Sequence, residues 1–109
     1  SRSTNTKRPV SNKADSSIHI FAETLMGNCA QAGRVIRNYT GSAPGDVSSY
    51  EDLWRFTLVN YNAGPGCLSL AIEGTLNNFE PLDWEHVSSH LTPVCQGALD
   101  YVEDITRVP

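Results

Sequence analysis

Apolar residues recur at steps of three and four along most of the chain, which is the spacing of one face of an α-helix. The first such stretch predicts a helix from about Ser17 to Asn38, with Asp15 or Ser16 as its N-cap. Its apolar stripe comprises Ile18, Phe21, Leu25, Cys29, Ala32, Val35, Ile36 and Tyr39. Gly27 and Gly33 each weaken this helix by up to about 1 kcal/mol relative to alanine, so we expect another helix to pack closely there.

A second helix is predicted to begin after Ser49 and to end near Asn62. Ser49 precedes Asp52 by three residues, an arrangement close to a capping box. The apolar residues of this helix are Leu53, Trp54, Phe56, Leu58 and Tyr61. A Gly-Pro-Gly turn at positions 64–66 separates it from a third helix, predicted from Pro65 to Gly74 because proline suits the first helical position. The third helix is expected to bury Leu68, Leu70, Ala71 and Ile72.

The rest of the chain continues the helical pattern. Glycine and proline predict a loop over residues 40–47, and residues 77–81 end the third helix. Asp83 can cap a short segment from Trp84 to His90, and Thr92 with Pro93 opens the last helix. The apolar stripe of the last helix comprises Val94, Ala98, Leu99, Val102 and Ile105. No stretch alternates as a strand would, so the predicted fold is all-α, a small domain of orthogonally packed helices of unequal length.

Length and composition restrict the class of protein. The 109 residues suit one domain, and no run approaches the roughly 18 apolar residues of a membrane span. The net charge of −4 argues against nucleic acid as the main ligand, because phosphate neutralisation needs a clustered excess of lysine and arginine. We therefore expect neither a nucleic-acid partner nor a membrane span.

The start of the chain is basic and polar. Arg2, Lys7, Arg8 and Lys13 are four of the eight basic residues, and no acidic residue stands among the first thirteen. The apolar content there is too low for independent folding, which predicts a flexible arm or linker over residues 1–14 and a helical domain over residues 15–109. A sharper hypothesis is an arm that docks on an acidic neighbour. The chain contains no apolar signal-peptide core, as expected if an export signal has been removed.

Three cysteines occur without any Cys-x-x-Cys spacing, so we expect no zinc site, and we expect no other metal or cofactor. Cys67 and Cys95 each follow a helix-opening proline, in first turns that can face each other, and we predict a disulfide between them. It would close a loop of about 28 residues and stabilise the fold by about 3 to 4 kcal/mol. Cys29 lies on an apolar stripe and is predicted to be a buried thiol.

An alternative makes Cys95 a nucleophile. A helix N-terminus lowers the pKa of a thiol, and His86 and His90 lie just upstream. The same two histidines are equally well explained as one polar face of a short helix.

The turn after the second helix presents a polar aromatic and a carboxamide together, as Tyr61, Asn62, Ala63 and Gly64. This Tyr-Asn-Ala-Gly sequence resembles the signature of the soluble lytic transglycosylases, bacterial peptidoglycan-cleaving proteins with a goose-lysozyme-like helical fold. The resemblance implies a lysozyme-like helical lobe over residues 15 to 107, an extracytoplasmic location, and substrate binding at these four residues. Read from the residues alone, Tyr61 is equally the buried end of an apolar stripe and Asn62 a helix C-cap.

In that family one glutamate of an upstream Glu-Ser motif protonates the leaving sugar, and the sugar's own 6-hydroxyl attacks to give a 1,6-anhydro product. No Glu-Ser dipeptide occurs in this chain, so its catalytic residue is unknown. Glu23, Glu51 and Glu73 are more typical of solvated helix charges than of a general acid.

Two hypotheses follow for the function. The first is a peptidoglycan-directed, lytic-transglycosylase-like domain whose general acid lies outside these residues. The second is a noncatalytic structural or accessory subunit of a larger extracytoplasmic assembly. Trp54 and Trp84 could stack on sugars, but the helical spacing of Trp54 favours core packing, and Trp84, between two acidic residues, is expected to be partly exposed.

Overall fold

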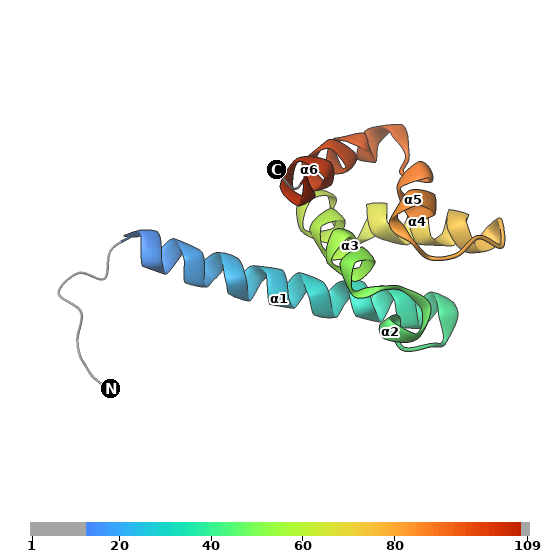
Figure 1. The fold of residues 1–109 in the computed structure, drawn as a ribbon, viewed down its shortest axis with the longest axis horizontal. Helices are drawn as coiled ribbons and strands as arrows, with labels where there is room; N and C mark the ends of the chain where they lie inside the picture. Colours follow the sequence, from blue (N-terminus) through green and yellow to red (C-terminus); the bar gives the residue numbers. More distant parts are fainter. Residues whose placement is uncertain (1–12, 108–109) are drawn as a thin grey trace.

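The computed structural model describes residues 13–107, which form six α-helices and one short 3-10 helix and contain no strand (Figure 1). This confirms the prediction of a small all-α domain. The predicted basic arm falls almost wholly on residues 1–12, outside the described range. The elements in order are α1 (Lys13–Thr40), α2 (Pro44–Val47), α3 (Tyr50–Ala63), α4 (Pro65–Asn77), α5 (Trp84–Ser89), η1 (Pro93–Cys95) and α6 (Gln96–Thr106).

Helix α3 lies at the centre of the domain. It crosses α1 rather than running alongside it, and α4 and α6 pack against its other sides (Figure 1). Five consecutive residues in its middle and last part, 56–60, are buried. A helix that is buried all round, rather than along one stripe, belongs to the interior of a fold. The prediction of a single apolar stripe on this helix was therefore too narrow.

The hydrophobic core draws on every long helix. Its buried apolar members are Ala32, Ile36, Phe56, Leu58, Val59, Leu68, Ala71, Ile72, Leu82, Val87, Leu91, Cys95, Ala98 and Val102. Most of these belong to the predicted stripes, but Leu70, which was predicted to be buried, is exposed. Further members of the predicted stripes are also exposed, among them Phe21, Tyr39, Val94 and Ile105, and Val94 is 93% accessible. Helical spacing identifies an apolar face, whereas the ends of a stripe are buried only where a neighbouring helix reaches them.

Helix α1 is longer than predicted at both ends, and its first half projects past the rest of the domain (Figure 1). The described chain accordingly measures 55 × 27 × 26 Å. Gly33 is explained by packing, because a Cβ there would lie 3.3 Å from Cγ of Pro44 in α2. Gly27 has nothing within 4 Å of such a Cβ, so the expected close helix is missing at that position among the described residues.

Two helix starts are fixed by the predicted caps. The Ser49 hydroxyl accepts the Asp52 backbone N–H at 3.1 Å and donates to the Asp52 carboxylate at 2.9 Å. The Asp83 carboxylate accepts the His86 N–H at 2.9 Å at the start of α5. The predicted loop over residues 40–47 contains the one-turn helix α2, which starts at Pro44.

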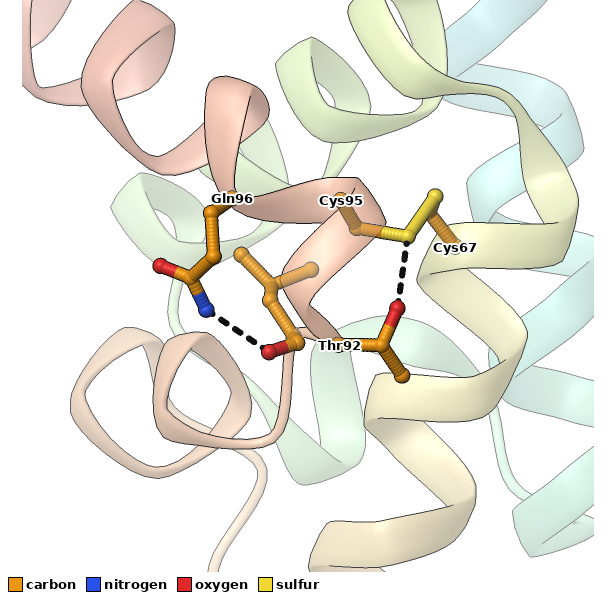
Figure 2. The surroundings of a disulfide bond; sticks show 5 residues. Cys67, Thr92, Cys95 and Gln96 are labelled. Atoms are coloured by element: carbon orange, nitrogen blue, oxygen red, sulfur yellow. Dashed lines mark hydrogen bonds between the residues drawn. A yellow bond between two sulfur atoms is a disulfide. The ribbon is translucent and has the colours of Figure 1, made fainter.

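The predicted Cys67–Cys95 disulfide is present, with 5.9 Å between the two Cα atoms (Figure 2). It joins the first turn of α4 to η1, which leads directly into α6. The Thr92 hydroxyl donates to Cys95 Sγ at 3.2 Å, and Gln96 Nε2 donates to the Leu91 carbonyl at 2.7 Å (Figure 2). Cys29 is a free thiol, half-buried rather than fully buried as predicted.

Replacing both Cys67 and Cys95 with alanine should lower the free energy of unfolding by about 3 to 4 kcal/mol, because the unfolded chain regains the entropy of a closed loop. Urea unfolding measures this loss. Cys29→Ala is the matched control and should change the unfolding free energy by less than about 1 kcal/mol, since its side chain is only half-buried. Equal losses in the two variants would contradict a stabilising bridge.

Candidate functional site

Gly64 forms the junction between α3 and α4. It is the C-cap of the first helix and the N-cap of the second, with φ +93° and ψ 165°, a conformation that is essentially restricted to glycine. Its N–H donates to the Asn60 carbonyl at 2.9 Å, and its carbonyl accepts the Leu68 N–H at 3.4 Å. The turn therefore fixes the chain direction directly after Tyr61 and Asn62.

Tyr61 lies among aromatic side chains from three helices. Its ring stands edge-to-face on Phe21 of α1, with centroids 5.6 Å apart, and 6.2 Å from the ring of Tyr101 of α6. Burial raises the pKa of Tyr101, and the neighbouring Tyr61 raises it further. We call Phe21, Tyr61 and Tyr101 the aromatic cluster. Tyr61 remains 39% exposed, so it is not simply the buried end of a stripe.

Asn62 and Ala63 of the Tyr-Asn-Ala-Gly sequence differ in their exposure to solvent. Asn62 is exposed, and because Gly64 is the C-cap of α3, the alternative that Asn62 fills this position is wrong. Ala63 is half-buried against the core. Tyr61 and Asn62 are thus the two side chains that this turn presents at the surface.

Sequence reasoning missed Asn60, which is only 2% exposed. Its Nδ2 donates to Asn28 Oδ1 at 2.7 Å and to Gln31 Oε1 at 2.8 Å, both on α1. Its Oδ1 is buried without a protein partner. These bonds fix the rotation of α3 against α1 one residue before Tyr61. Asn60 is 32 residues from Asn28 and 29 from Gln31, so no local pattern predicts their contact. The only local indication was that Asn28 and Gln31, three residues apart, share one face of a helix.

The glutamates weighed as general acids do not have the environment that such an acid needs. Glu23, Glu51 and Glu73 are all exposed. A carboxylic acid that donates a proton near neutral pH usually lies in an apolar pocket that raises its pKa. Glu51 borders the hollow described below but stays exposed to solvent, and Glu23 and Glu73 are exposed outside it.

The two histidines are held separately. His86 Nδ1 lies 2.7 Å from Asp83 Oδ1, and His90 Nε2 lies 2.7 Å from Glu80 Oε1. The hydrogen bond to Asp83 raises the pKa of His86, and the His86 backbone N–H is the main cause that lowers the pKa of Asp83. Because Cys95 is in the disulfide, the hypothesis of a cysteine nucleophile is wrong. Within residues 13–107 no group of three or more His, Cys, Asp or Glu side chains could hold a metal ion.

A hollow of about 300 Å³ lies at the opposite end of α3. Trp54 lines it, together with Tyr50, Glu51, Arg55 and Thr106. The expectation that Trp54 packs in the core is therefore wrong, since it lines the hollow, whereas Trp84 is partly exposed as expected and packs one side against the core. Helical spacing alone could not separate these two environments.

Comparison of the chain with protein-family models, with curated proteins and with solved structures finds no match in any of the three. No helix in the described part of the chain has both the length and the apolar composition needed to cross a membrane.

Gly64→Ala should lower the free energy of unfolding by about 1 to 3 kcal/mol, because alanine is strained at this backbone conformation even though a Cβ there meets nothing within 4 Å. Thermal or urea unfolding measures the change. Gly66→Ala is the control in the same turn. It also meets nothing within 4 Å and has no positive φ, so its stability should stay the same or rise by up to about 1 kcal/mol.

The His86 and Asp83 pair predicts a pH-dependent contribution to stability. A raised histidine pKa means that this contribution is full below the unfolded value of 6.5 and is lost as the pH rises through the folded pKa. A lowered aspartate pKa means that it is present above 3.8 and is lost as the pH falls through the folded pKa. Asp83→Asn keeps the N-cap but removes the charge. It should therefore destabilise the domain most between about pH 4 and 6.5.

Titration of the His86 ring by NMR checks the same pair directly. Its pKa should lie above 6.5 in the wild-type chain and move back toward 6.5 in Asp83→Asn. An unchanged His86 pKa in the variant would rule out Asp83 as the cause.

Proposed function

We propose that this chain is a peptidoglycan-directed, lytic-transglycosylase-like domain that binds glycan strands at Tyr61 and Asn62 and does not contain its own catalytic glutamate. One observation carries the proposal. The Tyr61 ring is held half-exposed beside Phe21 and Tyr101, and Asn62, the next residue along the chain, is also exposed. The Tyr-Asn-Ala-Gly sequence that resembles the transglycosylase signature therefore lies at the surface.

The chemistry of this surface suits an N-acetylated sugar. A sugar ring has an apolar C–H face, which can cover the exposed part of an aromatic ring, and hydroxyl and acetamido groups around its edge. The carboxamide of Asn62 offers a donor and an acceptor at once, so it can pair with either kind of edge group. Because Tyr61 is packed against two rings and follows the fixed Asn60, little side-chain entropy remains to be lost on binding.

The general acid is the missing part of a transglycosylase. Bond cleavage requires a proton donor beside the scissile oxygen, and Glu23, Glu51 and Glu73 are exposed charges on three different helices. We infer that a glutamate outside these 109 residues supplies the proton where cleavage occurs. The disulfide supports an extracytoplasmic location, because such bonds persist mainly in oxidising compartments.

Replacing Tyr61 and Asn62 together with alanine should weaken retention of the chain on purified peptidoglycan about tenfold or more, equivalent to about 1.4 kcal/mol or more of lost binding. Co-sedimentation over a range of peptidoglycan concentrations measures it, with circular dichroism to show that the variant is folded. Tyr39→Ala is the matched control, since Tyr39 is also an exposed tyrosine but lies near the far end of α1. Equal retention of all three chains would refute a glycan site at this turn.

Mass analysis of the muropeptides released from peptidoglycan tests the catalytic half of the proposal. The folded chain alone should release no products with 1,6-anhydro ends. Such products would show that a carboxylate of this chain serves as the general acid, and the proposal that the glutamate lies elsewhere would then be wrong.

A second candidate function is that of a noncatalytic structural or accessory subunit. The observation that favours it is the projecting half of α1, where the apolar side chains of Ile20 and Met26 are exposed. A partner protein that covered these two side chains would remove their apolar surface from water, which favours association. Retention on peptidoglycan that depends on Tyr61 distinguishes the first function from this one.

A further inference from the structure

The hollow at the start of α3 is separate from the Tyr61 turn. Tyr50, Glu51, Trp54 and Arg55 line it from α3, and Thr106 lines it from the end of α6. Tyr50 and Tyr61 are eleven residues apart on the same helix, which corresponds to about 16 Å along its axis. The two places share no residue, so the hollow has to be explained on its own.

Two aromatic rings form one wall of the hollow. The Tyr50 ring stands edge-to-face on Trp54, with 6.2 Å between the centroids. Tyr50 is 72% exposed and Trp54 is half-exposed, so neither ring is covered as a core side chain would be. The two ring planes are nearly perpendicular, at 80°, so the exposed face of one ring offers a ligand a flat apolar surface and the other ring stands beside it.

Arg55 is held in place beside these rings. Its guanidinium lies 3.5 Å from Asp52 Oδ1, and the same oxygen accepts the Trp84 backbone N–H at 3.1 Å. The Ser49 hydroxyl donates to the other oxygen of Asp52 at 2.9 Å. The carboxylate that positions Arg55 is therefore itself fixed by the starts of α3 and α5. An arginine carries five N–H donors, so this ion pair leaves most of them available to a ligand.

The hollow also provides acceptors. The Glu51 carboxylate has no hydrogen-bond or ion-pair partner among residues 13–107. The Thr106 hydroxyl donates to the Val102 carbonyl at 2.8 Å, which leaves its oxygen free to accept. The hollow thus contains a positively charged donor, Arg55, and a negatively charged acceptor, Glu51, next to its aromatic wall.

We propose that this hollow is a second ligand site that binds a single neutral sugar ring. Adjacent charges of opposite sign give little net attraction for an ion, but together they pair with the hydroxyls of a polyol. The aromatic wall takes the apolar face of the ring. A volume of about 300 Å³ is at the small end of ligand sites, which suits one ring rather than an extended chain.

The apolar side chain of a protein partner is the competing occupant, because Trp, Tyr and Arg are the residues that dominate protein interfaces. An aliphatic or aromatic anchor would displace water from Glu51 and Arg55 without replacing its hydrogen bonds, which costs free energy. The hydroxyls of a sugar would instead replace the hydrogen bonds that this water makes to Glu51 and Arg55. The polar groups of the hollow therefore favour the sugar.

The fluorescence of Trp54 tests the proposal. Trp84→Phe leaves Trp54 as the only tryptophan, so its emission reports on the hollow alone. Glucose and N-acetylglucosamine, titrated separately, should give a saturable change with at least one of them at a Kd of the order of millimolar, as expected for a ligand of this size. Glycerol at the same concentrations is the control for a solvent effect and should give no saturation.

Four variants in the Trp84→Phe background locate the binding. Tyr50→Ala removes an exposed ring without disturbing the core and should weaken the sugar response at least tenfold, whereas Tyr39→Ala should leave it unchanged. Glu51→Gln, which keeps an acceptor but loses the charge, should weaken it several-fold. Tyr61→Ala should leave it unchanged, so the result is independent of the outcome at the Tyr61 turn.

Each contrary result overturns the proposal. No saturable change with either sugar up to about 100 mM would exclude a sugar site. A response that survives Tyr50→Ala and disappears with Tyr61→Ala would place all sugar binding at the Tyr61 turn. A response to N-acetylphenylalaninamide without a response to sugars would identify a protein side chain as the occupant.

Discussion

The rest of the structure depends on the burial of α3 on all its sides. Helices α1, α4 and α6 all pack against it, and residues 56–60 are buried without interruption. A helix without a free face in its middle can present side chains to solvent mainly at its ends. The Tyr61 turn lies at one end and the hollow beside Tyr50 and Trp54 at the other. The position of both candidate sites is thus a consequence of how the core is built.

Both ends of α3 are fixed by polar contacts to neighbouring helices. At the C-terminal end, the Asn60 amide is bound to Asn28 and Gln31 of α1. At the N-terminal end, Asp52 accepts hydrogen bonds from the backbone of Trp84 and from Ser49 of its own cap. Hydrophobic packing alone would let the central helix rotate or slide among similar arrangements. The directional bonds select one of them, and so they set which way the exposed rings face.

Features with a local cause could be predicted from the sequence, and features set by the placement of helices could not. The caps at Ser49 and Asp83, the turn at Gly64 and the disulfide follow from residue type and near neighbours. The burial of Asn60 and the position of Trp54 at the hollow depend on which helix lies opposite. Spacing shows that a helix has an apolar face, but not how many neighbours surround it.

The disulfide makes the attachment of α6 depend on the redox state of two cysteines. It ties the start of α4 to the segment that leads into α6, and α6 supplies Tyr101 to the aromatic cluster and Thr106 to the hollow. While the two thiols are reduced, this link is absent and α6 is held to the domain by noncovalent contacts alone. Oxidation of one pair of cysteines therefore strengthens the attachment of both surfaces at once.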